Sequence, residues 1–166
     1  GNHWLLAGFV DLAILFAIAT GALRRRFGDR ADLARRLFPA ARLCLIGFYS
    51  FAAFAKLNSS FFDPSVSCAT FFFRESSQSL GVEAVQLGGA AWLEWVVIVG
   101  TAAVELAIPV LLVVRRTRAA GVLVALAFHA VLALDRTHQF FDFSSTLYAL
   151  FVLFLPASVG TWVAER

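Results

Sequence analysis

Apolar segments, each about long enough to cross a lipid bilayer, account for most of this sequence. A helix needs roughly 20 consecutive apolar residues to span a hydrocarbon core of about 30 Å. Hydrophobic residues make up 60% of the chain and charged residues only 15%, against about 25% charged in a typical soluble domain. We therefore predict a single domain, residues 1–166, that forms an all-α, polytopic transmembrane helical bundle of about five spans. The predicted spans are residues 4–23, 40–57, 92–114, 119–134 and 147–163.

Arginine is concentrated in two of the segments that connect these spans, and loops rich in Arg and Lys stay on the cytoplasmic side of a membrane. Both segments are therefore predicted to face the cytoplasm, so the first span enters from the outside. The chain contains no Met, and we expect further sequence before residue 1. The arginines are Arg24, Arg25, Arg26, Arg30, Arg35, Arg36 and Arg42 in the first segment, and Arg115, Arg116 and Arg118 in the second.

The connections on the opposite side, residues 58–91 and 135–146, carry more acidic than basic side chains. Residues 58–91 also contain phenylalanines that alternate with Ser, Asp and Arg, which is typical of a segment lying in the membrane interface. A loop that is merely hydrophobic is the alternative. We predict a multi-pass protein of the cell membrane with an interfacial amphipathic segment on its outer side. Lys56 and Cys68 are expected toward that same side.

Several classes of functional site have no support in the sequence. Cys44 and Cys68 lie in a predicted span and in a predicted outer loop, so we expect neither a disulfide between them nor a metal site. No glycine-rich phosphate loop or nucleophile elbow is present. The sequence pI of about 9.4 is explained by the cytoplasmic arginines, which suit anionic lipid headgroups. The predicted partner is therefore a lipid bilayer and not a nucleic acid.

Lys56 is the one lysine among the 14 Lys and Arg residues of the chain, and it lies at the outer end of span 40–57. Arginine stays protonated in proteins, whereas a lysine amine loses its proton readily once it is desolvated. A site that needs a neutral amine therefore has to use lysine. The alternative is that Lys56 snorkels, with its stem along the lipid and its ammonium at the interface.

Further ionisable residues fall inside or at the edge of the predicted spans, namely His3, Asp11, Glu105 and His129. At a rise of about 1.5 Å per residue, all but Glu105 share the outer half of the membrane with Lys56. Ionisable groups in a membrane are functional candidates because their burial is costly. Each also has a structural alternative: Asp11 hydrogen-bonds a neighbouring helix, His129 is a core histidine, and Glu105 neutralises an arginine.

Short motifs stand at the ends of the predicted spans. They are Asn2-His3-Trp4-Leu5-Leu6, Ala55-Lys56-Leu57-Asn58, and Phe128-His129 followed by Phe140-Phe141-Asp142-Phe143. Together they resemble the vitamin K-dependent γ-carboxylase family. More broadly, the chain is similar to bacterial relatives with the HTTM membrane domain. The resemblance runs from residue 2 to about residue 156.

The resemblance implies chemical roles for two residues. In that family the lysine of the corresponding motif is implicated as the base that deprotonates the hydroquinone of vitamin K, which points to Lys56. The histidine of the Asn-His motif assists at the carboxylation step, which points to His3. The expected cofactor is a reduced naphthoquinone of the vitamin K type, and no metal is expected. The residues expected to line the quinone pocket are Asn2, Asp11, Asn58, Glu105 and His129.

Departures from the family's pattern bear on the reaction. Ala55 stands where a second lysine is usual, Asn58 replaces Asp, and these residues supply no large lumenal domain for a protein substrate. Quinol oxidation or epoxidation is therefore favoured over protein carboxylation. The alternative is a non-catalytic helical subunit of a larger membrane complex, which the small size and the 18 Phe residues favour. A transporter or channel is a third hypothesis, although the sequence contains no internal repeat.

Overall fold

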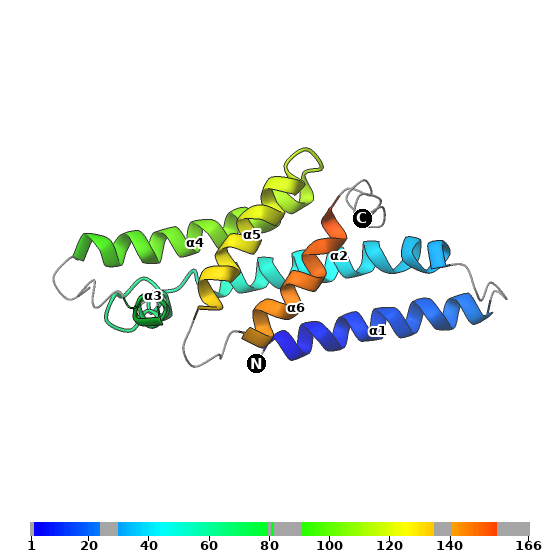
Figure 1. The fold of residues 1–166 in the computed structure, drawn as a ribbon, viewed down its shortest axis with the longest axis horizontal. Coiled ribbons are helices and arrows are strands. Elements are labelled where there is room, and N and C mark those ends of the chain that lie inside the picture. The colour runs from blue at the N-terminus through cyan, green and yellow to red at the C-terminus, as the bar shows by residue number, and fades with distance from the viewer. Residues whose placement is uncertain (1, 24–29, 80, 82–90, 135–140, 156–166) are drawn as a thin grey trace.

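The computed structural model describes residues 2–23, 30–79, 81, 91–134 and 141–155, and every regular element within these ranges is a helix (Figure 1). The all-α prediction is therefore confirmed for the described residues. The elements are α1 (Asn2–Leu23), α2 (Arg30–Ala55), α3 (Cys68–Ser79), α4 (Ala91–Val113), α5 (Arg118–Leu132), α6 (Phe141–Phe151) and the short 3-10 helix η2 (Val152–Phe154).

The longest helices lie side by side along the long axis of the molecule. α2 packs against both α1 and α4, and α5 packs on α4 (Figure 1). α5 and α6 contact each other and run obliquely across the long helices. α3 is seen end-on in Figure 1, so it runs across the direction of the long helices, and it contacts α4 and α5. This short helix lies near the C-terminal end of α2.

Two of the described helices are long and apolar enough to cross a membrane, by length and composition, at Leu37–Ala55 in α2 and Ala91–Val113 in α4. The five-span bundle therefore stays a prediction. Large apolar side chains on the long helices point outward: Phe16 is 71% exposed, Phe51 78% and Trp92 68%. Such surfaces are typical of contact with a membrane or another protein. The shorter apolar helical stretches are Gly8–Thr20, Arg118–Leu132 and Phe143–Phe154.

α2 differs from the predicted span 40–57 at both ends. It begins at Arg30 and continues through Pro39, so part of the arginine-rich stretch is helical. The helix ends at Ala55, whose carbonyl oxygen accepts a hydrogen bond from Asn58 Nδ2 at 2.7 Å. This side chain satisfies a carbonyl that the helix itself leaves unpaired. The chain can therefore leave α2 and turn toward α3.

The last predicted span, residues 147–163, is described only in part. α6 begins before it, at Phe141, and η2 ends at Phe154. Residues 156–163 lie outside the described ranges, as do the arginines at 24–26 of the predicted cytoplasmic loop. The end of η2 is tied to α2, because Arg42 Nε donates to the carbonyl oxygen of Leu153 at 2.7 Å. Arginine is well suited to capping the C-terminal carbonyls of a helix.

A buried apolar cluster joins four helices. Its fully buried side chains are Leu45 of α2, Ile108 and Leu112 of α4, Val122 and Ala125 of α5, and Leu147 and Phe151 of α6. α4 and α5 approach closely at Gly121, where a Cβ atom would lie 2.9 Å from Leu111 Cβ. A side chain at this position would push the two helices apart. The glycine therefore lets α5, which carries His129, lie directly against α4.

Candidate functional site

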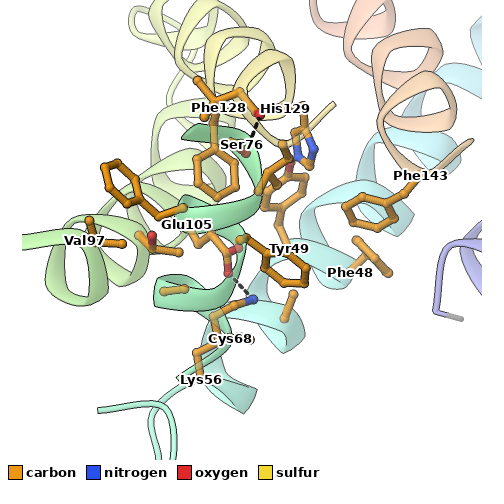
Figure 2. A pocket seen from close by; sticks show the side chains of 17 residues that line it. Phe48, Tyr49, Lys56, Cys68, Ser76, Val97, Glu105, Phe128, His129 and Phe143 are labelled. Carbon is orange, nitrogen blue, oxygen red and sulfur yellow. Dashed lines mark hydrogen bonds and ion pairs between the residues drawn. The ribbon is translucent and has the colours of Figure 1, made fainter. Parts of the chain in front are cut away.

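A cavity of about 220 Å³ lies among α2, α3, α4, α5 and α6 (Figure 2). Its wall is mainly aromatic and aliphatic, and few polar groups reach it. An engineered apolar cavity of about 150 Å³ binds benzene, so this cavity has room for a somewhat larger aromatic ring system. The polar lining residues are Tyr49, Lys56, Cys68, Ser76, Thr101, Glu105 and His129, and the phenylalanines are Phe48, Phe72, Phe73, Phe128 and Phe143.

Two helix faces supply much of the polar lining. Tyr49, Ala52 and Lys56 follow the i, i+3, i+7 spacing that places residues on one face of α2 and its final turn. Thr101 and Glu105 are four residues apart, so they lie on one face of α4. α2 packs directly against α4. Their facing sides therefore meet at the cavity.

Lys56 and Glu105 form an ion pair in this cavity, with Nζ 2.5 Å from Oε2 (Figure 2). Glu105 is 8% exposed and the Lys56 side chain is 24% exposed, so both charges are largely withdrawn from water. Opposite charges attract strongly in such surroundings, and either charge alone would be costly there. Within the described residues, Oε2 makes no hydrogen bond besides this ion pair. The pair therefore places an amine and a carboxylate side by side among the lining residues of the cavity.

Tyr49 and His129 form the second polar contact, a hydrogen bond between the phenolic oxygen and Nε2. Both residues are buried, at 3% and 2% exposure. Aromatic rings hold the imidazole, with centroids 5.4 Å away for Phe128, 5.3 Å for Phe143 and 6.1 Å for Phe151. The other ring nitrogen, Nδ1, is buried and has no hydrogen-bond partner in the described part of the chain. The imidazole therefore has a defined orientation, and its Nδ1 is left unpaired among the described residues.

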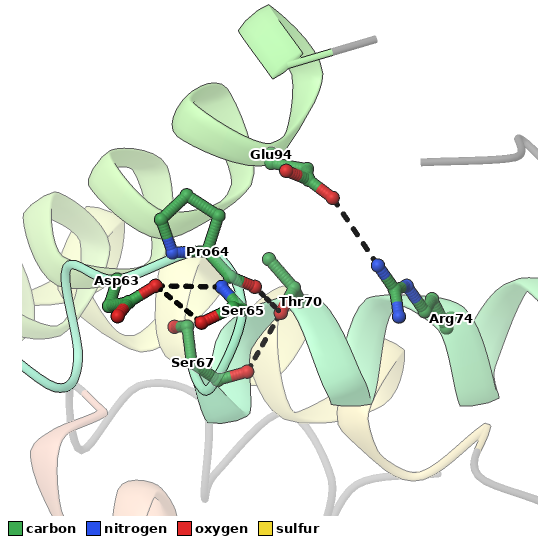
Figure 3. Close-up of polar contacts among 7 residues, drawn as sticks. All are labelled: Asp63, Pro64, Ser65, Ser67, Thr70, Arg74 and Glu94. Atoms are coloured by element: carbon green, nitrogen blue, oxygen red, sulfur yellow. Dashed lines mark hydrogen bonds and ion pairs between the residues drawn. The ribbon is translucent and has the colours of Figure 1, made fainter. Parts of the chain in front are cut away.

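α3 lies against the cavity and is held by polar contacts on both of its flanks (Figure 3). Asp63 Oδ1 accepts hydrogen bonds from Ser65 N at 2.9 Å and from Ser65 Oγ at 2.7 Å, which stabilises the turn before the helix. These hydrogen bonds hold the pKa of Asp63 below its usual value. Farther along α3, Arg74 Nη2 lies 3.3 Å from Oε1 of Glu94 in the first turn of α4. The turn before α3 is therefore held by local hydrogen bonds, and Arg74 links α3 to α4.

Three of the site residues predicted from the sequence line the cavity together: Lys56, Glu105 and His129. Lys56 follows the end of α2, Glu105 is in the middle of α4, and His129 is in the last turn of α5. The amine of Lys56 is paired with a carboxylate inside the cavity. This contact favours the buried-site interpretation of Lys56 over snorkelling.

The other predicted residues are placed differently. Asn58 does not line the cavity; its Nδ2 caps α2 and its Oδ1 accepts a hydrogen bond from Phe61 N at 2.9 Å. Asp11 is exposed on α1 and does not line the cavity either. Asn2 and His3 belong to α1, but their side chains lie outside the described part of the structure. The role of His3 therefore stays a prediction.

Tyr49 and Cys68 also line the cavity, and neither was a predicted pocket residue. Tyr49 has a signal in the sequence, because it stands two helical turns before Lys56 on the same face. Cys68 has none, because its position depends on the irregular chain between α2 and α3. Partial burial raises the pKa of the Cys68 thiol.

Comparison with known proteins adds no family assignment. The chain matches no protein-family model, no curated protein and no solved structure. The resemblance to the vitamin K-dependent γ-carboxylase family therefore rests on the short motifs around Lys56, His3 and His129.

Proposed function

We propose that the chain is a multi-pass helical membrane protein with five spans, arginine-rich loops in the cytoplasm, and the cavity toward the outer side. The length and apolarity of α2 and α4 support this proposal, as do the outward-pointing apolar side chains. α5 has 15 residues and is short for a hydrocarbon core of about 30 Å. Its crossing requires local thinning of the bilayer. The orientation of α3 across the long helices fits the interfacial segment on the outer side.

We further propose that the cavity binds a reduced quinone and that Lys56 accepts a proton from a ligand hydroxyl group. The observation that carries this proposal is the ion pair of Lys56 and Glu105 inside a largely aromatic cavity. Apolar walls with a few convergent polar groups are the usual composition of a small-molecule site. The motif Ala55-Lys56-Leu57-Asn58 adds support, because its resemblance assigns the same role to this lysine.

A reduced naphthoquinone supplies two hydroxyl groups and an oxidisable ring when it is bound. Lys56 becomes a neutral base when Glu105 takes the proton of its ammonium group, and a positioned amine of this kind is an effective general base. Glu105 thereby controls the charge of the site. The phenylalanines that line the cavity make its wall largely apolar, which limits loss of the transferred proton to solvent. In this proposal His3 is the second proton partner, as its motif implies.

The test is oxidation of vitamin K hydroquinone by the full-length protein in aerated lipid nanodiscs, with dioxygen as the oxidant. Lys56→Met removes the amine, and Lys56→Arg keeps a positive charge beside Glu105 but offers no neutral base. We expect both variants to lower turnover at least about 100-fold, the lower bound for general base catalysis. Arg74→Met is the matched control, because it removes a cation of α3 that does not line the cavity. Undiminished turnover in both Lys56 variants would exclude Lys56 as the base.

A non-catalytic subunit of a larger membrane complex is the second candidate. An apolar groove of about 450 Å³ between α2 and α4 favours it, because no titratable side chain of the described residues lines this groove. Transmembrane helices associate through close packing of such surfaces. Purification of a stable complex that contains the chain and no quinone would support this candidate. A stoichiometric naphthoquinone in the purified protein would support the enzyme instead.

A further inference from the structure

The imidazole of His129 is held in place on one side and left unpaired on the other. Nε2 is hydrogen-bonded to the Tyr49 hydroxyl group. Nδ1 is fully buried and has no hydrogen-bond partner within the described residues. Buried polar atoms in folded proteins are nearly always hydrogen-bonded, so an orphaned one calls for an explanation. Because His129 lines the cavity, a ligand in the cavity is a natural partner for it.

The cavity has two polar poles. Figure 2 shows Lys56 toward one end of the pocket and His129 toward the other, with Tyr49 between them. Phe128 and Phe143, whose centroids lie 5.4 Å and 5.3 Å from that of the imidazole, supply apolar surface next to His129. A ligand that satisfies both poles needs a flat apolar body and a polar group at each of two opposite edges.

We infer that the cavity selects an aromatic ring with oxygen substituents at opposite edges, one contacting the Lys56–Glu105 pair and the other contacting His129 Nδ1. This inference rests on the proposed quinol-binding function and adds a specificity determinant to it, the Tyr49–His129 pair. Tyr49 is a positioning residue, because its hydroxyl group fixes the imidazole without being needed for ligand contact. His129 recognises the second oxygen through a hydrogen bond at Nδ1.

A hydroxyl group suits His129 in either of its neutral forms. When the Tyr49 hydroxyl group donates to Nε2, Nδ1 carries the ring proton and can donate to a ligand oxygen. When Tyr49 accepts instead, Nδ1 is an acceptor and needs a ligand donor. A hydroxyl group both donates and accepts, whereas a carbonyl oxygen only accepts. The two-pole geometry therefore fits a diol, the reduced form of a quinone, in both tautomers.

The test compares two probes bound to the full-length protein in nanodiscs, under anaerobic conditions. The first is 2-methyl-1,4-naphthohydroquinone, and the second is 2-methyl-1-naphthol, which lacks the second oxygen. A site built to hydrogen-bond a ligand hydroxyl group discriminates strongly against the analogue without it. We expect the diol to bind at least tenfold more tightly. This ratio is measured on the unaltered protein, so it does not depend on whether any variant folds.

Variants then show which residues cause the tighter binding of the diol. His129→Phe should reduce the ratio of the two dissociation constants to about one while naphthol binding is kept, because the ring shape remains and the nitrogen is lost. Tyr49→Phe should lower the ratio partly. Ser77→Ala is the control, because Ser77 is in α3 but does not line the cavity, and its hydroxyl group donates to the carbonyl oxygen of Phe73 at 2.7 Å. Its ratio should match that of the unaltered protein.

The outcomes separate this inference from the proposed function. Equal binding of both probes by the unaltered protein overturns the two-pole inference and leaves the quinol site standing. A preference that survives in His129→Phe also overturns it, because another group must then read the second oxygen. Failure of both probes to bind overturns the proposed quinol site together with the inference.

Discussion

The ion pair of Lys56 and Glu105 stabilises the protein only while both charges are present. Each side chain has left most of its hydration for the cavity. Removing one partner leaves the other charge buried without compensation, which costs about 3–5 kcal/mol for a fully buried pair. Replacing both partners with apolar groups removes the desolvation cost as well and is often nearly neutral. An apolar pair could therefore serve stability as well as Lys56 and Glu105 do, whereas the proposed chemistry needs the amine and the carboxylate.

We predict that Lys56→Met and Glu105→Gln each lower the free energy of unfolding by on the order of 2–3 kcal/mol, less than for a fully buried pair because Lys56 is 24% exposed. The double variant should be destabilised by less than the sum of the single variants. Thermal unfolding of the purified protein in one detergent measures all three. The difference between the sum for the single variants and the value for the double variant is the coupling energy of the two charges.

The control for this cycle is the pair of Arg74 and Glu94, where the Arg74 side chain is 49% exposed. Exposed ion pairs contribute about 0–1 kcal/mol, so Arg74→Met and Glu94→Gln should change the unfolding temperature little. Strict additivity of Lys56→Met and Glu105→Gln would contradict the prediction. It would mean that the two charges do not interact in the folded protein.

At the scale of elements, the contact of α4 with α5 decides where His129 stands relative to Glu105. Gly121 is the narrow point of this contact, since a Cβ atom there would meet Leu111 Cβ at 2.9 Å and the backbone of α4 at 3.2 Å. Backbone cannot move aside as the end of a flexible side chain can. A larger residue must therefore displace α5 as a unit.

We predict that Gly121→Val destabilises the protein by about 1–3 kcal/mol, the usual cost of overpacking a closely packed interface. Gly100→Ala in α4 is the matched control, because no atom in the described part of the chain lies within 4 Å of a Cβ atom there. That substitution should be neutral or stabilising by about 0.5–1 kcal/mol, since alanine favours a helix over glycine. Unfolding in detergent measures the stability of both variants. Binding of 2-methyl-1,4-naphthohydroquinone measures whether the displacement of α5 disturbs the cavity. Unchanged stability of Gly121→Val would show that α4 and α5 are not tightly packed.

Helix positions followed from the sequence where an apolar stretch is bounded by polar loops. α4 and α5 begin and end within two residues of the predicted spans 92–114 and 119–134. The start of α2 was not predicted, because apolarity indicates the part of a helix that enters lipid and not the helix itself. α3 was expected as an interfacial segment. Its helical form depends on the Asp63 turn and on contacts with α4 and α5, which lie far apart in sequence.

At the scale of the whole molecule, the packing of the helices decides which of the predicted residues come together, so only part of the site could be predicted. The sequence predicts Lys56, Glu105 and His129 as site residues because ionisable groups in apolar segments are costly, and that argument needs no knowledge of packing. Asp11 meets the same criterion, but its side chain is exposed on α1. The sequence indicates how deep a residue lies in a span, but not how the helix is rotated about its axis, so it could not exclude Asp11. Tyr49 was not predicted, because its role depends on its contact with His129 of α5. Such a contact between two helices cannot be read from the residue type alone.

The orientation of the whole molecule in the membrane can be tested with its own cysteines. The proposed topology places Cys68 on the outer side and the connection between α4 and α5 in the cytoplasm. Cys68 is exposed, and we predict that a membrane-impermeant maleimide labels it on intact cells that express the full-length Cys44→Ala variant. Because partial burial raises the pKa of this thiol, less reactive thiolate is present at neutral pH, and labelling should accelerate as the pH rises.

The opposite face needs a cysteine introduced at a position that is already exposed. Ala119 lies in the first turn of α5 and is exposed, so Ala119→Cys in a chain with Cys44→Ala and Cys68→Ala provides it without removing an arginine. This variant should be labelled only after the membrane is permeabilised, because basic loops are retained in the cytoplasm. If Cys68 were protected on intact cells and the Ala119→Cys variant were labelled there, the topology would be inverted. The Lys56–Glu105 pair would then open toward the cytoplasm, and a quinol site at the outer surface would be excluded.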